Sequence, residues 1–145
     1  MEESNTLERF LDPQNFMYEL ALTEIRNGRK EEHWIWFIFP QLRGIGKSRL
    51  SYHYGIQDIE EAKSYYAHPI LGKRLHEATL LLLHQDKDLE EIFGHMDAMK
   101  VRSCMTLFFR ATGEEMFMKV IDKFFGGVED EVTVELLKTG KKRES

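Results

Sequence analysis

The sequence predicts an all-α protein, a single compact domain of about seven to nine short helices. Apolar residues recur at helical spacing through most of the 145 residues. Short groups of Gly, Pro, Asn and Asp interrupt this pattern and are typical of helix ends. Because the chain has no internal repeat, linker or change of composition, we expect one domain over residues 1–145, with short flexible ends at about 1–6 and 140–145.

The first helix is predicted from its two ends. Asp12 is typical of an N-cap and Pro13 of a first helical residue, so the helix begins at Pro13 and continues through Ile25. Asn27 and Gly28 then form a typical helix end.

Further boundary signals predict the remaining helices. Asp58 is typical of an N-cap and Pro69 of a helix start, whereas Gly126 and Gly140 are typical of helix ends. The helices that follow from these signals and from apolar spacing cover residues 59–66, 69–82, 97–111, 117–124 and 132–138.

The helix over 97–111 carries two stripes. The first contains Val101, Cys104, Met105 and Phe108 and is predicted to face the core. The second contains Met99, Ser103, Thr106 and Arg110 and is flanked by Lys100 and Arg102. It has two interpretations: an exposed helix side, or a polar, cationic wall that binds an anion.

The run over 34–39 holds both tryptophans and is unbroken in its apolar character until Pro40. Its β-branched and aromatic residues are also typical of a buried strand, and periodicity does not separate the two in so short a run. We predict a short buried helix.

The glycine-rich stretch after this run resembles part of a phosphate-binding loop. A P-loop needs a glycine five positions before Gly46, and that position holds Gln41. No parallel-sheet pattern follows either. A looser anion-binding loop, with Arg43, Lys47 and Ser48 as donors, remains compatible with the sequence.

Composition excludes several classes of function. A net charge of −5 argues against a nucleic-acid partner, and the apolar runs are too short to span a membrane. Six scattered histidines and a lone Cys104 predict no metal site, no disulfide and a buried, inert thiol. We expect no cofactor, no signal peptide at the start of the chain and a cytoplasmic location. The sequence leaves the oligomeric state open.

One candidate site remains, around the polar ends of the aromatic run. His33, which follows two glutamates, is the candidate acid/base, although a capping or hydrogen-bonded core histidine is an equal interpretation. The candidate ligand-binding residues are Trp34, Trp36, Gln41, Arg43, Lys47, Lys100, Arg102 and Ser103.

The functional hypothesis is binding of an anionic small molecule, a phosphorylated metabolite or nucleotide, with hydrolase-type activity. The alternative is a non-catalytic interaction module in which the aromatic run is purely core.

Long stretches of the chain resemble a known family. They include the segment His33-Trp34-Ile35-Trp36-Phe37-Ile38-Phe39-Pro40-Gln41-Leu42, residues 67–75, residues 100–108 and residues 124–127. These stretches look like the signature of a mainly bacterial domain-of-unknown-function family, some members of which are labelled "calpastatin". The resemblance covers about residues 7–137. It implies a mainly α-helical domain, a helical run at 34–39 and no activity that can be carried over.

A second, weaker similarity is to the YbiA-like N-glycosidases, which are all-α proteins linked to ADP-ribose-type substrates. It rests on Glu32 and His33 before an aromatic segment, a Lys-x-Arg helix at 100–102, and Lys123 with Phe124. It implies no role for any residue, but it makes a phosphorylated nucleotide a reasonable ligand class to test.

Overall fold

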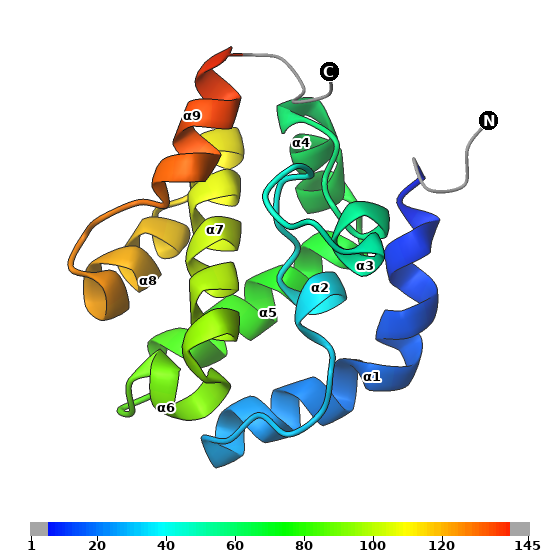
Figure 1. Cartoon of the computed structure of the whole chain (residues 1–145). Helices are drawn as coiled ribbons and strands as arrows, with labels where there is room; N and C mark the ends of the chain where they lie inside the picture. Colours follow the sequence, from blue (N-terminus) through cyan, green and yellow to red (C-terminus); the bar gives the residue numbers. More distant parts are fainter. Residues whose placement is uncertain (1–5, 140–145) are drawn as a thin grey trace.

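The structure is a computed structural model that describes residues 6–139, and over this range it confirms the all-α prediction (Figure 1). The described residues contain no strand, only a single parallel bridge between Leu42 and Ile56. The helices are α1 Glu8–Asn27, α2 Ile35–Ile38, α3 Arg49–His53, α4 Ile59–Ala67, α5 Leu71–Leu83, α6 Leu89–Phe93, α7 His95–Thr112, α8 Glu115–Phe125 and α9 Glu131–Thr139.

Helix α7 lies at the centre of the fold and packs against α4, α6, α8 and α9 (Figure 1). Its predicted core stripe is buried, because Val101, Cys104, Met105 and Phe108 have no exposed surface. The ring of Phe108 lies 5.4 Å from that of Tyr65 on α4 and 5.9 Å from that of Phe117 on α8. This aromatic contact joins three helices into one core.

Several predicted helix ends are confirmed. The Asp58 carboxylate accepts a hydrogen bond of 2.9 Å from the Glu61 amide and so caps α4. Gly28 ends α1 and Gly126 ends α8, both in the left-handed conformation. The helix that follows Pro69 begins at Leu71, two residues later than predicted.

The predicted start of α1 is wrong. The helix begins at Glu8, one turn before Pro13, and it contains that proline. Proline within a helix removes one backbone hydrogen bond, and this local cost is the reason why proline usually marks a helix start. Contacts made by the extra turn offset this cost, because Phe10 is fully buried and Arg9 forms a network described below.

The aromatic run forms a short buried helix, as predicted. Helix α2 covers only Ile35–Ile38, and Trp34 and Phe39 flank it with no exposed surface. The rings of Trp34 and Phe39 both pack edge-on against Phe93 of α6, with centroids 5.8 and 6.4 Å away. The run is therefore part of the core.

The second stripe of α7 is not the exposed helix side that one interpretation expected. Ser103 is 3% exposed and Thr106 is fully buried. The Thr106 hydroxyl accepts a 2.9 Å hydrogen bond from the Asp130 amide, so the α8–α9 connection covers this part of α7. Met99 is half-buried, and Arg110 is the exposed member of the stripe.

Two expectations lie wholly or mostly outside the described residues. The flexible ends expected at 1–6 and 140–145 fall there except for Thr6, and so does the helix end expected at Gly140.

Candidate functional site

Trp34 is held inside the protein by a buried carboxylate. Its indole Nε1 donates a 2.9 Å hydrogen bond to Glu24 on α1, and the same Glu24 oxygen accepts from the amides of Glu31 and Glu32. Burial by itself raises the pKa of Glu24, but these hydrogen bonds and nearby Lys30 outweigh it and lower the pKa. Trp34 therefore orders the segment before α2 and presents no surface to a ligand.

Lys100 belongs to a second internal cluster at the start of α7. Its ammonium lies 3.1 Å from one oxygen of Asp97, and Lys30 lies 2.8 Å from the other. Lys100 also lies 4.6 Å from the centroid of the Trp36 ring, within cation–π distance. Burial raises the pKa of Asp97, but the two lysines more than compensate and lower it. These cations are thus engaged with groups of the protein itself.

Arg102, the other predicted cation of α7, fastens the connection between α8 and α9. Its guanidinium donates to the carbonyl oxygens of Val128, at 2.8 Å, and Glu129, at 3.3 Å. Arg110 pairs with the Glu129 carboxylate at 2.6 Å. Buried Ser103 lies on the same helix. The side of α7 that was predicted to bind an anion is therefore occupied by the α8–α9 connection, which Arg102 and Arg110 hold in place.

Two of the predicted residues that follow α2, Arg43 and Lys47, lie on a closed loop, which we call the basic loop (residues 43–53), and Gln41 lies at its base. The Gln41 carbonyl accepts from the Ile56 amide at 2.8 Å, and the Arg43 amide donates to the Ile56 carbonyl at 2.7 Å. These two bonds close the base of the loop. A Cβ on Gly55 would lie 2.7 Å from the Arg43 Cα, so the chain segments approach too closely for any side chain there.

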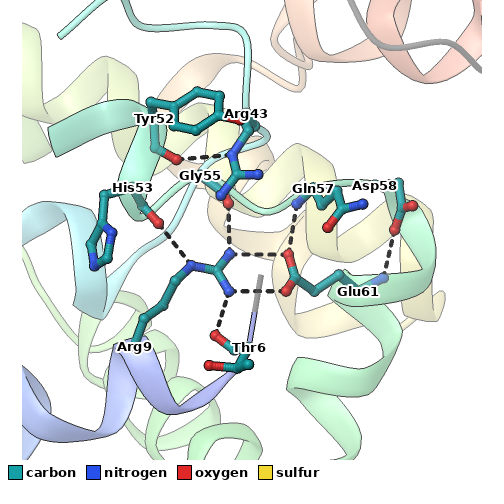
Figure 2. Close-up of polar contacts among 9 residues, drawn as sticks. All are labelled: Thr6, Arg9, Arg43, Tyr52, His53, Gly55, Gln57, Asp58 and Glu61. Atoms are coloured by element: carbon teal, nitrogen blue, oxygen red, sulfur yellow. Dashed lines mark hydrogen bonds and ion pairs between the residues drawn. The ribbon is translucent and has the colours of Figure 1, made fainter. Parts of the chain in front are cut away.

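Arg9 supports the basic loop from below (Figure 2). Its guanidinium donates to the carbonyls of Thr6, His53 and Gly55 and forms two 3.0 Å bonds to the Glu61 carboxylate. These bonds use all five of its N–H donors. Glu61 also accepts a 2.7 Å hydrogen bond from the Gln57 amide. This buried pair holds the end of α3 and the start of α4 against α1.

Arg43 and Tyr52 form the outer part of the loop (Figure 2). The Arg43 guanidinium lies 4.2 Å from the centroid of the Tyr52 ring, and its Nε donates a 2.8 Å hydrogen bond to the Tyr52 carbonyl. Burial lowers the pKa of Arg43, and the neighbouring positive charge of Arg9 lowers it further. Tyr52 is 59% exposed, so the outer face of its ring is open to solvent.

Lys47 and Arg49 add two exposed cations to the basic loop. Neither forms an ion pair with a carboxylate among residues 6–139. The Ser48 hydroxyl, which the sequence offered as an anion donor, instead accepts a 3.1 Å hydrogen bond from the Ser51 amide and caps α3. Arg43 and Lys47 therefore share the basic loop, whereas Lys100 and Arg102 are engaged with Asp97 and with the α8–α9 connection.

His33, the candidate acid/base, is exposed on the segment before α2, and its imidazole forms no hydrogen bond with another described residue. His53 is the histidine of the basic loop, with its ring 4.6 Å from that of Tyr54. Within residues 6–139, no group of three or more His, Cys, Asp or Glu side chains has the arrangement of a metal site. The described helices include none long and apolar enough to cross a membrane.

The sequence did not reveal Arg9, Glu24 or Glu61 as organising residues. Each is a charged residue in a helix, where an exposed position is the usual expectation. Their partners lie many positions away, and Arg9 and Glu61 are 52 residues apart. Among the residues that the sequence analysis did not single out, Arg49 and Tyr52 were the ones that the sequence could have indicated. They follow Arg43 and Lys47 closely and add a further positive charge and an aromatic ring.

The comparisons with known proteins concern almost the whole chain. Residues 4–137 match the model of the family DUF1810, described as a protein of unknown function. The chain is similar to the crystal structure of the conserved hypothetical protein Rv1873 from Mycobacterium tuberculosis, with 48% sequence identity and a TM-score of 0.88. The similarity covers 91% of this chain and 96% of that protein. No curated protein matches the chain.

Proposed function

The chain belongs to the DUF1810 family of proteins of unknown function, and from that starting point we propose that it binds an anionic small molecule on the basic loop. One observation carries the proposal. Residues 33–57 contain no Asp or Glu, although the chain as a whole has 25 of them and a net charge of −5. A local excess of positive charge in an acidic protein attracts and orients an anion.

The available cations support this location. Lys47 and Arg49 are exposed and unpaired with any carboxylate in the described part of the chain. Lys100 and Arg102 already interact with Asp97 and with the α8–α9 connection. An anion at α7 would have to compete with these contacts, whereas Lys47 and Arg49 have no carboxylate to give up among residues 6–139.

The aromatic surface narrows the class of ligand. Tyr52 offers an open ring face, and Arg43 stacks against the same ring. A planar base stacks on an aromatic ring with about 1–3 kcal/mol of binding free energy. A phosphorylated nucleotide, with its base on Tyr52 and its phosphate near Lys47 and Arg49, fits both features of the loop.

The loop is also held in place before any ligand arrives. The bonds between Gln41, Arg43 and Ile56 close its base, and Arg9 fixes its end. A site that is ordered in advance loses less conformational entropy on binding. If the ligand is also a substrate, its hydrolysis needs an acid/base close to the bound anion. His53 fits this role better than His33, because His53 belongs to the basic loop and His33 lies before α2.

The test is a thermal-shift and calorimetric titration with adenosine diphosphate, ribose 5-phosphate and inorganic phosphate. At 100 times its Kd, a ligand raises the free energy of unfolding by about 2.7 kcal/mol. We expect the double substitution Lys47→Ala/Arg49→Ala to weaken binding at least about tenfold. Lys73→Ala, an exposed lysine on α5, is the matched control and leaves binding unchanged. The absence of a shift with all three compounds contradicts the proposal.

A non-catalytic interaction module is the second candidate function. It is favoured by the burial of Trp34 and Phe39, which makes the aromatic run core, and by Leu50 and Tyr52 of α3, which are 48% and 59% exposed. An apolar and aromatic surface of this kind suits a protein partner. In that case none of the three compounds stabilises the protein, and Leu50→Ser is as stable as the wild type.

A further inference from the structure

A cleft of about 320 Å³ lies between the start of α1 and the end of α3, on the far side of Arg9 from Glu61. This volume is at the lower end of the range for small-molecule sites. It is lined by Thr6, Glu8, Arg9, Asp12, Pro13, His53 and Tyr54. Except for His53, these residues lie outside the basic loop.

The charges that line the cleft are unbalanced. Glu8 and Asp12 are exposed, and neither carboxylate has an ion-pair partner in the described range 6–139. They are four residues apart on α1, a spacing that places two side chains on the same helix face. The guanidinium of Arg9 is matched by Glu61 and uses its five donors within the protein, so it does not neutralise them.

Two aromatic rings, those of His53 and Tyr54, also line the cleft. The rings of His53 and Tyr54 meet edge to face at 4.6 Å, and Tyr54 is anchored by Phe37 of α2 at 5.5 Å and by Phe10 of α1 at 6.0 Å. Burial raises the pKa of Tyr54, and the negative charge of Asp12 raises it further. Aromatic faces and carboxylates together attract cations.

We propose that this cleft binds a small organic cation, a primary amine or guanidine on a short apolar chain, between Asp12 and Glu8 on one side and Tyr54 on the other. The charged head pairs with the two carboxylates, and the apolar part packs against Pro13 and Tyr54. A neutral molecule of the same shape gains only the second contact. The proposal does not rest on the anion site, because the charged groups that would hold the cation, Glu8 and Asp12, are not those that would hold the anion, Lys47 and Arg49.

The test uses the full chain and 1,4-diaminobutane as the probe, with 1,4-butanediol as its neutral counterpart. Nuclear magnetic resonance follows the amide and ring signals of His53 and Tyr54 during each titration. We expect saturable shifts with the diamine and none with the diol. Asp12→Asn and Glu8→Gln each weaken diamine binding about fivefold, and the exposed α1 substitution Glu19→Gln leaves it unchanged.

Three outcomes would overturn the proposal. The diamine could give no saturable shift at these two residues. The diol could bind as well as the diamine, which would make the cleft an apolar site. Binding could also survive both carboxylate substitutions unchanged, which would place the amine elsewhere. Because Glu8 and Asp12 are exposed and not hydrogen-bonded to other described residues, the two variants are expected to fold like the wild type.

Discussion

The run over 34–39 and the basic loop over 43–53 are neighbours in the sequence, and each carries at least one large aromatic ring. In the run, Trp34 is fully buried and its polar atom is bonded to Glu24. In the loop, Tyr52 is 59% exposed and stacks on a cation. The contrast teaches that the presence of an aromatic residue does not distinguish the core from an exposed surface. What distinguishes them is whether tertiary neighbours cover the ring.

The largest expected effect is the loss of the core ring. Trp34→Ala removes a fully buried side chain and leaves the Glu24 carboxylate without its indole partner, so we expect a loss of about 3–5 kcal/mol in the free energy of unfolding. Urea denaturation at neutral pH measures it. A loss below about 1 kcal/mol would contradict the assignment of this run to the core.

The second effect concerns the carboxylate that holds the run. Burial raises and hydrogen bonds lower the pKa of Glu24, with a net decrease from its ordinary value of 4.5. The stability that Glu24 contributes is therefore fully present above pH 4.5 and is lost as the pH falls below that value through the folded pKa. Glu24→Gln should cost about 1.5–3 kcal/mol near neutral pH.

Urea denaturation of Glu24→Gln and wild type at about pH 7 and about pH 3.5 checks this dependence. The difference between the two proteins should shrink at the acidic pH. A difference that is the same at both values would show that the Glu24 charge is not what stabilises the run.

The third effect lies at the base of the basic loop. Gly55→Ala places a methyl group 2.7 Å from the Arg43 Cα and 2.8 Å from the Ser51 carbonyl oxygen, so the loop must shift. We expect a loss of about 1–3 kcal/mol and weaker binding of the anionic ligand. Ser64→Ala, at an exposed position on α4, is the control and should change stability by less than about 0.5 kcal/mol. An unchanged Gly55→Ala protein would mean that the loop is not held as the structure indicates.

The smallest effect on stability is expected at Tyr52, the exposed aromatic residue of the basic loop. Tyr52→Ala should change the free energy of unfolding by less than about 0.5 kcal/mol, because the side chain is mostly exposed. It should nevertheless weaken nucleotide binding by about 1–3 kcal/mol if the base stacks there. Phe16→Ala, an 86% exposed ring on α1, is the matched control for both measurements. Nucleotide binding that is equal in wild type and Tyr52→Ala would remove the stacking surface from the proposal.

About the fold, local patterns were enough for most elements. The Asp58 cap, the helix end at Gly28 and the buried stripe of α7 were all predicted correctly. About the candidate site, the sequence was correct in seeing basic residues after the aromatic run, but it grouped Arg43 and Lys47 with Lys100 and Arg102. In the structure the α7 cations are already engaged, because Lys100 pairs with Asp97 and lies over the Trp36 ring, and Arg102 bonds to the α8–α9 connection.

The sequence alone determined that this protein is helical and where most of its helices end, because caps and apolar spacing depend on residues only a few positions apart. The tertiary structure decided where α1 begins, that Trp34 is fully buried whereas Trp36 is half-buried, and that Lys47 and Arg49 are exposed. Those outcomes depend on contacts such as Arg9 with Glu61, 52 residues apart, which form only when the helices pack. Burial and charge pairing are properties of the packed fold, and no local pattern specifies them.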